Sequence, residues 1–226
     1  MAKKQVKKEE EAIALDVQLT KTEAFIEKNL KKILCVIGAV IVVVVAGFLW
    51  NNYKNGKEAD AQQAIAKSQQ AFAQQQYEQA LNGDGTQSAG FLRIIDEYSG
   101  TKTANVAKLY AALCYAKTEK YDEAIKMFEG FSQEDDQMIS PASLAALGNC
   151  YIQKGQNDKG VDMLLKAAKA ANNDAITPLC LLQVAEVYEA DGKSDKAVEL
   201  YKEIKEKHFR SPLSADMDKY IERATK

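Results

Sequence analysis

The residue types that most often catalyse reactions or bind metals are scarce in this chain. It has one histidine, His208, and four cysteines, with no Cys-x-x-Cys or Cys/His spacing of the kind found in zinc or redox sites. His208 lies among charged residues near an expected helix end, where the helix dipole favours a cation. The sequence therefore predicts no catalytic residues, no metal and no cofactor.

A glycine-rich stretch, Gly83-Asp84-Gly85, resembles a ligand-binding loop only superficially. No Gly-Lys-Ser/Thr follows it and no strand precedes it, as a phosphate-binding loop would require. A calcium loop that began at Asn82 would need a glutamate at its twelfth position, where Arg93 stands. We expect a turn here, and we expect the protein not to be an enzyme.

Composition narrows the function further. The chain has 226 residues, with 30 Lys+Arg against 32 Asp+Glu, and its formal net charge is −2. A nucleic-acid binder needs a basic surface, which a sequence pI of about 5.7 does not favour. We expect protein partners, with neither nucleic acid nor a small-molecule substrate.

Residues 33–50 form the most distinctive segment, eighteen residues without a charge. As a helix, such a segment spans about 27 Å, close to the hydrocarbon thickness of a bilayer. The alternative, a buried core helix, seldom lacks polar residues over this length. We expect one transmembrane helix.

Lysines predict the orientation of that helix. Eight lie ahead of residue 33, whereas only Lys54 and Lys57 follow closely, with Trp50 and Tyr53 as interfacial anchors. No small-residue cleavage site follows the apolar stretch, so it is typical of an uncleaved signal anchor. The N-terminus is therefore expected in the cytoplasm, the helix in the membrane as a single pass, and the remainder on the far side of that membrane. The predicted regions are a Lys-rich cytoplasmic tail, the anchor, a juxtamembrane linker and a folded domain, at 1–32, 33–50, 51–57 and 58–226.

Beyond the membrane the pattern is helical throughout. Residues 58–81 are expected as one Ala/Gln-rich helix, and later segments of about 11–16 residues alternate with short polar breaks. Pro141, Pro178 and Pro212 stand near helix starts, each preceded by a possible N-cap: Ser140, Thr177 and Ser211. No segment alternates as a half-buried strand does. The predicted fold class is all-α.

The helices repeat. A small residue is followed three positions later by tyrosine at Ala112, Gly148 and Ala185, with offsets of 36 and 37 residues. Small residues where antiparallel helices cross, with a ring beside them, are what stacked helical hairpins require.

This pattern resembles the tetratricopeptide repeat. The resemblance implies a right-handed α-solenoid with repeats at about 105–140, 141–177 and 178–210 and a capping helix at 211–226. This sequence departs from the family pattern in three ways: its repeat units are longer, Lys108 stands at position 4 of the first repeat, and the usual proline at position 32 of the repeat is missing. The repeat-packing residues that it implies, at positions 8, 11, 20 and 24, are Ala112, Tyr115, Ala124, Phe128, Gly148, Tyr151, Gly160, Leu164, Ala185, Tyr188, Ala197 and Tyr201.

The whole architecture resembles a narrower family, the YfgM-like ancillary subunits of the bacterial Sec translocon. A Lys-rich tail, one anchor, an Ala/Gln-rich helix and the segment FLRIIDEYSGTKTANVAKLYAAL carry this resemblance. It implies a single-pass protein of the bacterial inner membrane, with the N-terminus in the cytoplasm and the repeat domain in the periplasm. It also implies association with the SecYEG channel, periplasmic chaperones or exported clients. A structural envelope scaffold, organising a cell-wall or outer-membrane complex, is the alternative. A third class, an organelle import receptor facing the cytosol, disagrees with the lysine distribution.

The repeat resemblance also implies where partners bind, because the first helices of such hairpins line a concave face. We call the residues that it places there the candidate groove. Its apolar character suits an extended or helical hydrophobic segment, but the helix expected at 58–81 is an alternative occupant. A carboxylate clamp is not expected, since Ala145 stands where the clamp lysine should be and only Asn149 is present. The candidate groove comprises Leu109, Leu113, Lys117, Asn149, Ile152, Gln153, Leu182, Glu186 and Glu189.

The cysteines are expected to be structural. Cys35 lies in the anchor, and Cys114, Cys150 and Cys180 lie on repeat helices. An exported domain could oxidise them, but stacked helices are about 8–10 Å apart whereas a disulfide needs Cα atoms within about 7 Å. Buried free thiols are favoured.

Overall fold

The computed structural model describes residues 2–86 and 88–226, with side chains described from Phe25 onward except those of residues 27 and 33. The described residues form helices and connecting turns, without a strand, which confirms the all-α prediction. The chain divides into two compact units, residues 1–56 and 57–226. The helices are α1 (Ala2–Ala73), α2 (Tyr77–Asn82), α3 (Phe91–Glu97), α4 (Lys102–Lys117), α5 (Tyr121–Glu129), α6 (Ile139–Gln153), α7 (Asn157–Ala171), α8 (Thr177–Ala190), α9 (Ser194–Lys207), the 3₁₀ helix η1 (Pro212–Asp216) and α10 (Met217–Ala224).

The first unit is the N-terminal part of α1. Within the described residues, one helical segment is long and apolar enough to cross a membrane, judged by length and composition. It runs from Lys28 to Ala73, and its most apolar 18-residue window has a mean hydropathy of 3.0 and no buried residues. Residues 51–57, predicted as a linker, are helical and lie within α1. These seven residues contain one glycine, Gly56, and no proline, so none of them forces the helix to end.

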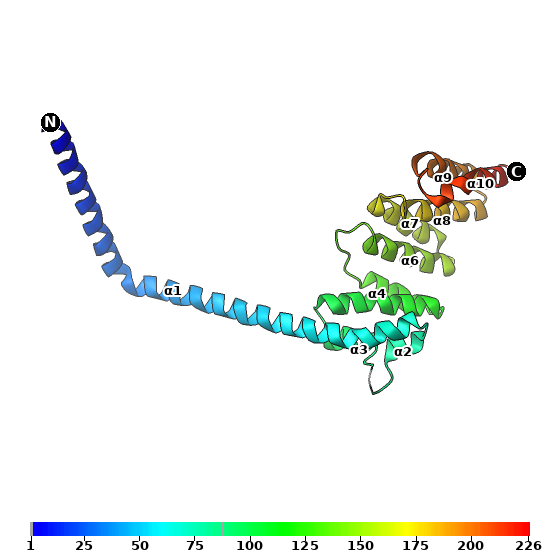
Figure 1. Ribbon diagram of the computed structural model, residues 1–226, viewed down its shortest axis with the longest axis horizontal. Coiled ribbons are helices and arrows are strands. Elements are labelled where there is room, and N and C mark those ends of the chain that lie inside the picture. The colour runs from blue at the N-terminus through cyan, green and yellow to red at the C-terminus, as the bar shows by residue number, and fades with distance from the viewer. Residues whose placement is uncertain (1, 87) are drawn as a thin grey trace. The chain divides into compact units, whose positions relative to one another are not determined.

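The second unit is a stack of antiparallel helical hairpins (Figure 1). The helices pair as α4 with α5, α6 with α7 and α8 with α9, and each pair also packs on the next along the chain. η1 and α10 close the stack against α9. This arrangement confirms the predicted solenoid of hairpins. We call the first helix of each hairpin its A helix and the second its B helix, and we count the turn between α1 and α2 with the A-helix turns and the connection from α3 to α4 with the B-to-A connections.

Every A helix ends in the same kind of turn. One residue in each turn has a left-handed backbone conformation, with φ of 60° at Gln75, 61° at Glu119, 73° at Gly155 and 72° at Gly192. The helix predicted over residues 58–81 is therefore wrong, because the turn at Gln75 ends α1 at Ala73 and α2 begins at Tyr77. Sequence inspection missed this turn because glutamine seldom adopts this conformation.

The opposite connections, from B helix to A helix, are held by side-chain caps. Thr101 Oγ1 accepts a hydrogen bond from the Ala104 amide at the start of α4, and Ser211 caps η1 as predicted. Ser140 and Thr177 are not N-caps, because each already lies inside its helix. At α6 the cap is Asp136, whose carboxylate accepts hydrogen bonds from the amides of Met138, Ile139 and Ser140.

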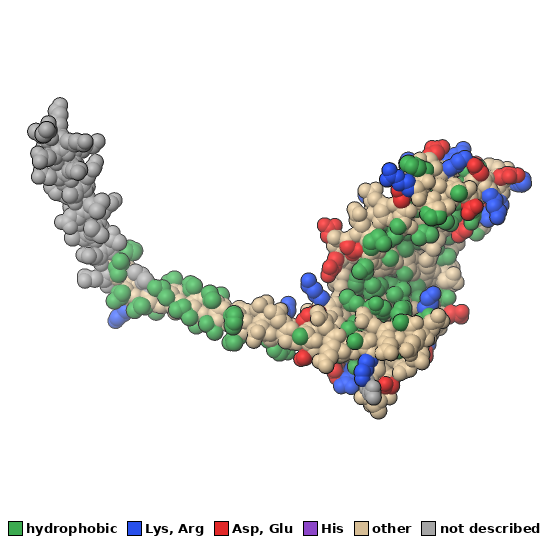
Figure 2. Space-filling view, in the orientation of Figure 1, with side chains coloured by type: hydrophobic (Ala, Val, Ile, Leu, Met, Phe, Trp, Pro, Cys, Tyr) green, Lys and Arg blue, Asp and Glu red, His purple; other side chains and the backbone are tan. Residues whose placement is uncertain are grey.

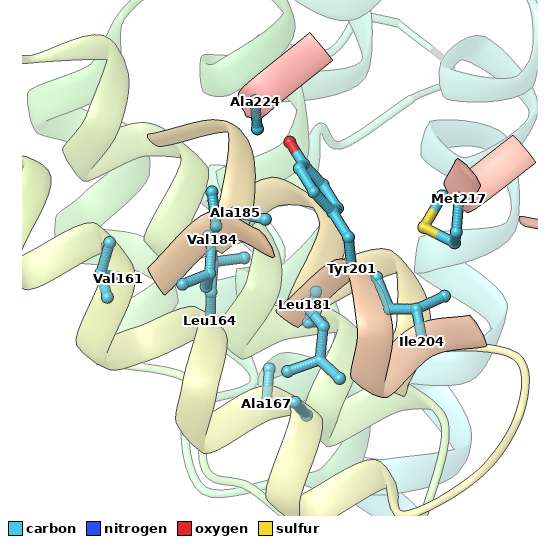
Figure 3. Packing of buried hydrophobic residues seen from close by; sticks show 13 residues of the cluster. Val161, Leu164, Ala167, Leu181, Val184, Ala185, Tyr201, Ile204, Met217 and Ala224 are labelled. Carbon is cyan, nitrogen blue, oxygen red and sulfur yellow. The ribbon is translucent and has the colours of Figure 1, made fainter. Parts of the chain in front are cut away.

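The buried side chains form three clusters in sequence order. One extends from Ile65 to Cys114, a second from Ala112 to Cys150, and a third from Val161 to Ala224. Figure 3 shows the third, where the Tyr201 ring lies beside Ala185 and its hydroxyl points toward Ala224. Tyr201 and Ile204 are completely buried, so α9 is the centre of this cluster.

Two glycines make the crossing of α6 and α7 especially close. A Cβ built on Gly148 would lie 2.8 Å from the Gly160 carbonyl oxygen, and a Cβ on Gly160 would lie 2.8 Å from that of Gly148. The corresponding crossings of the neighbouring hairpins use alanines, such as Ala112 and Ala185, both fully buried. Only glycine permits the backbones of α6 and α7 to approach this closely.

Candidate protein-binding site

The candidate groove residues lie on three successive A helices, α4, α6 and α8, and none of them is fully buried. Figure 2 shows hydrophobic side chains gathered over the region of these helices. Three of the nine residues are exposed and polar, namely Lys117, Gln153 and Glu186. The other six are half-buried: Leu109, Leu113, Asn149, Ile152, Leu182 and Glu189.

The apolar members of the candidate groove contact the core and remain partly accessible. Leu109 and Leu113 pack against the second cluster, while Ile152 and Leu182 pack against the third. A side chain in this position is held in place by its buried part and can still offer apolar surface to a partner. Partly accessible apolar side chains therefore follow one another along three successive A helices.

Glu189, at the C-terminal end of the candidate groove, is already paired. Its two carboxylate oxygens accept hydrogen bonds from Arg223 of α10, at 2.8 and 2.6 Å, and from the Tyr201 hydroxyl at 2.9 Å. The Arg223 hydrogen bonds, followed by that of Tyr201, lower the pKa of Glu189 despite its partial burial. Glu189 thus fastens the capping helix and offers a partner less charge than the sequence indicates.

The segment that could have filled the candidate groove packs elsewhere. Ile65 and Ala71 of α1 join the first cluster, which includes Phe91 of α3 but no residue of the candidate groove. Phe72 lies edge-on to Tyr110, with ring centroids 5.1 Å apart. The end of α1 is therefore packed on α3 and α4 rather than over the candidate groove.

A carboxylate near the start of the second unit strengthens this packing. Glu58 accepts hydrogen bonds from the Lys102 amide at 2.7 Å and from Thr103 Oγ1 at 2.6 Å, at the N-terminus of α4. Burial opposes its ionisation, but these hydrogen bonds outweigh burial and lower the pKa of Glu58. The negative charge also complements the positive end of the α4 dipole.

The residues predicted to pack the repeats fall into two groups. The small residues and the larger side chains of the B helices are buried, whereas the three tyrosines of the A helices are half-buried. Tyr151 donates a hydrogen bond to Glu129 at 2.7 Å, which together with burial raises the pKa of Tyr151 to about 12. The buried group is Ala112, Ala124, Phe128, Gly148, Gly160, Leu164, Ala185, Ala197 and Tyr201, and the half-buried group is Tyr115, Tyr151 and Tyr188.

The three repeat cysteines are buried thiols. Burial raises the pKa of Cys114 to about 12 and those of Cys150 and Cys180 to about 11, so little thiolate forms near neutral pH. Among the described residues no group of three His, Cys, Asp or Glu side chains is placed to hold a metal ion. His208 instead pairs with Asp174, at 2.8 Å from Nδ1 to Oδ1.

Sequence inspection missed a second set of accessible apolar residues. Met138, Ile139 and Phe209 lie in or beside connections between hairpins and are 56%, 58% and 67% exposed. Their signal was present, because each is a large apolar residue within a stretch rich in charged and turn-forming residues. Periodicity does not detect such residues, since Met138 and Phe209 lie outside the helices and Ile139 is only the first residue of α6.

Known proteins resemble this chain through its repeats. A family model described as a tetratricopeptide repeat-like domain matches residues 23–171, and one described as a tetratricopeptide repeat matches residues 179–208. No curated protein matches the chain.

The solved structures similar to this chain include a Podosopora anserina protein assigned as a kinesin light chain with nearly identical TPR-like repeats, and a variant form of the same repeats. Each is 14% identical, with a TM-score of 0.58, over 74% of this chain and 86% or 85% of the other. At this identity the likeness supports the fold alone. Tetratricopeptide repeats indicate a protein–protein interaction module, and such folds are typically non-enzymatic scaffolds. Since the first family model matches more than half of the 226 residues, the chain belongs to the family of tetratricopeptide repeat-like domains.

Proposed function

We propose that this protein is a membrane-tethered interaction module, with its repeat domain in the periplasm, that assists exported proteins at the Sec translocon. One observation carries the proposal: an uncharged segment of membrane-spanning length precedes, in the same chain, repeats whose A helices expose apolar side chains. The segment supplies the tether, and the A helices supply a surface for hydrophobic partners.

The exposure of the apolar segment supports the tether. Val43 and Phe48 are each 70% exposed, and Trp50 is 65% exposed. Each large apolar side chain left in water forgoes about 1.5–3 kcal/mol of burial free energy. Lipid acyl chains remove this cost for the entire segment, and a helix satisfies every backbone group within the hydrocarbon.

The distribution of lysines supports the periplasmic side. Eight lysines precede residue 33, and two, Lys54 and Lys57, follow the segment closely. Positive charge near a span is retained on the cytoplasmic side. The repeat domain is therefore the exported part.

The apolar character of the candidate groove supports the class of partner. Leu109, Leu113, Ile152 and Leu182 offer no specific charge to recognise, which suits a variable hydrophobic segment of an emerging client or a partner's helix. The resemblance to ancillary translocon subunits points the same way. A scaffold for a cell-wall or outer-membrane complex, the second candidate function, would use the same surface on a single fixed partner.

Site-specific crosslinking tests the proposal. A photoreactive amino acid at Leu113 or Leu182 should crosslink to channel subunits, periplasmic chaperones or exported polypeptides, identified by mass spectrometry. The matched control is Leu165, an exposed leucine on a B helix, which should give few adducts. The double variant Leu113→Glu/Leu182→Glu should lose the adducts of a probe at Leu109 while remaining folded. Adducts only with cell-wall or outer-membrane proteins would contradict the translocon assignment.

A further inference from the structure

The two edges of the hairpin stack differ in chemistry. All turns from an A helix to its B helix lie along one edge, the turn edge, comprising residues 74–76, 118–120, 154–156 and 191–193. The connections from a B helix to the next A helix, each with the first residue of the helix that follows, lie along the other edge, the proximal edge, comprising residues 98–102, 130–139, 172–177 and 208–212. Antiparallel hairpins enforce this separation (Figure 1).

Exposed apolar side chains concentrate on the proximal edge. In the described part of residues 57–226, six large hydrophobic side chains are exposed, and three of them belong to this edge: Met138, Ile139 and Phe209. The turn edge contains only glycine and polar or charged residues. A stack that exposed apolar residues at random would not divide them this way.

Hydrogen bonds join the connections of the proximal edge to one another. Asn173 Nδ2 donates to the Gln137 carbonyl oxygen at 2.9 Å, and His208 Nδ1 lies 2.8 Å from Asp174 Oδ1. The apolar residues follow directly, Met138 after Gln137 and Phe209 after His208. They therefore form one neighbourhood on the surface.

The backbone that presents these residues is also fixed. The Asp136 carboxylate accepts the Met138 amide at 2.8 Å, and the Phe209 carbonyl oxygen accepts a hydrogen bond from Ser214 Oγ at 3.1 Å. Exposure of these large apolar side chains forgoes their burial free energy, and for Phe209 the contact given inside the fold is with the Arg210 guanidinium, 5.7 Å from the ring centroid. Such a surface is typical of an interaction site.

The chain itself brings a lipid surface within reach of this edge. Lys57 Nζ donates to the Ser99 carbonyl oxygen at 3.3 Å, and Glu58 binds the Lys102 amide, so α1 joins the stack at the proximal edge. Lys57 is seven positions after Trp50 in the sequence, and seven residues span about 25 Å at most. A covalent tether this short gives the edge a high effective concentration at the membrane.

We propose that the proximal edge docks on the lipid interface of the membrane to which the chain is tethered, with Phe209, Ile139 and Met138 inserted among the headgroups. The inference rests on the membrane tether of the proposed function. Lys207 and Arg210 flank Phe209 and favour an anionic surface, whereas Glu134 and Asp135 lie near Met138 and disfavour it. Insertion should accordingly be deepest at Phe209.

Tryptophan quenching in vesicles tests the docking. The chain has one tryptophan, Trp50, so Trp50→Phe provides a background for single probes. The full chain carrying Phe209→Trp is reconstituted in vesicles of phosphatidylethanolamine and phosphatidylglycerol with brominated acyl chains. We expect the fluorescence at position 209 to be quenched, but less than that of Trp50 in the natural chain, since an interfacial side chain lies about 5–10 Å into the headgroup region. Gln74→Trp, on the turn edge, is the matched control and should remain unquenched.

The outcomes separate the docking from the tether. Quenching of Trp50 without quenching at position 209 would overturn the docking and leave the tether intact. This is also the result expected if the proximal edge binds a membrane protein instead of lipid, because the vesicles contain no other protein. Absence of quenching at Trp50 would overturn both. If Phe209→Trp fails to fold, as judged by its ellipticity, Ile139→Trp replaces it with the same expected result.

Discussion

Adding one methyl group at Gly148 should destabilise the protein even though it improves helix propensity. Alanine in place of glycine within a helix is worth about 0.5–1 kcal/mol. Against this, the new Cβ would lie 2.8 Å from the Gly160 carbonyl oxygen, 3.1 Å from Leu164 Cγ and 3.2 Å from Met163 Cβ. A backbone oxygen cannot rotate away, so α6 and α7 must separate.

The size of the effect follows from these two opposed terms. Overpacking a core by a methyl-sized group costs about 1–3 kcal/mol. After the gain in propensity, we expect Gly148→Ala to lose about 1–2 kcal/mol of the free energy of unfolding. Gly160→Ala should behave similarly, and the double variant should lose less than the sum, because either methyl group alone already forces the helices apart.

Urea unfolding of the full chain in detergent, followed by ellipticity, measures these losses as a lower midpoint at unchanged slope. The matched comparison is Ala112→Gly, the reverse change at the corresponding crossing. It should also destabilise, because it removes a buried methyl group and lowers helix propensity. A Gly148→Ala variant more stable than the wild type would refute the close crossing.

Three further predictions concern charge and topology. Glu58→Gln should lower the free energy of unfolding at pH 7 by about 1–2 kcal/mol. Because the folded-state pKa of Glu58 lies below its ordinary 4.5, this difference should persist above pH 4.5 and vanish as the pH falls. Urea midpoints that differ by the same amount at low pH would contradict this. Arg223→Ala should release Glu189 and speed amide hydrogen exchange throughout α10, whereas Lys219→Ala on the same helix should not, and equal protection in both variants would exclude the proposed fastening. Lys226→Cys should react with a membrane-impermeant maleimide in intact spheroplasts, and labelling only after lysis would reverse the orientation.

The parts of the fold that follow local rules were predictable from sequence. Turns at Gly155 and Gly192 are marked by a residue that readily takes positive φ, and the offset of Ala112, Gly148 and Ala185 revealed the hairpins. The turns at Gln75 and Glu119 have the same geometry without that mark. There the packing of the hairpins overrides the local preference.

Contacts between residues distant in sequence were not predictable. Arg223 and Glu189 are 34 residues apart, as are His208 and Asp174. No sequence periodicity connects such pairs, so only the structure shows that Glu189 of the candidate groove is already paired with Arg223.

The division of the core into three clusters has a consequence for how the protein is made. Each cluster draws its buried residues from one stretch of chain, and the three stretches follow one another from Ile65 to Ala224. Contacts between neighbours in sequence form quickly and need no distant segment to be present. A nascent chain can thus close its first cluster while its last hairpins are still being synthesised, and each new hairpin then packs on a surface that is already folded. Growth from a fixed starting point, rather than collapse around a centre, is the assembly route that this core permits.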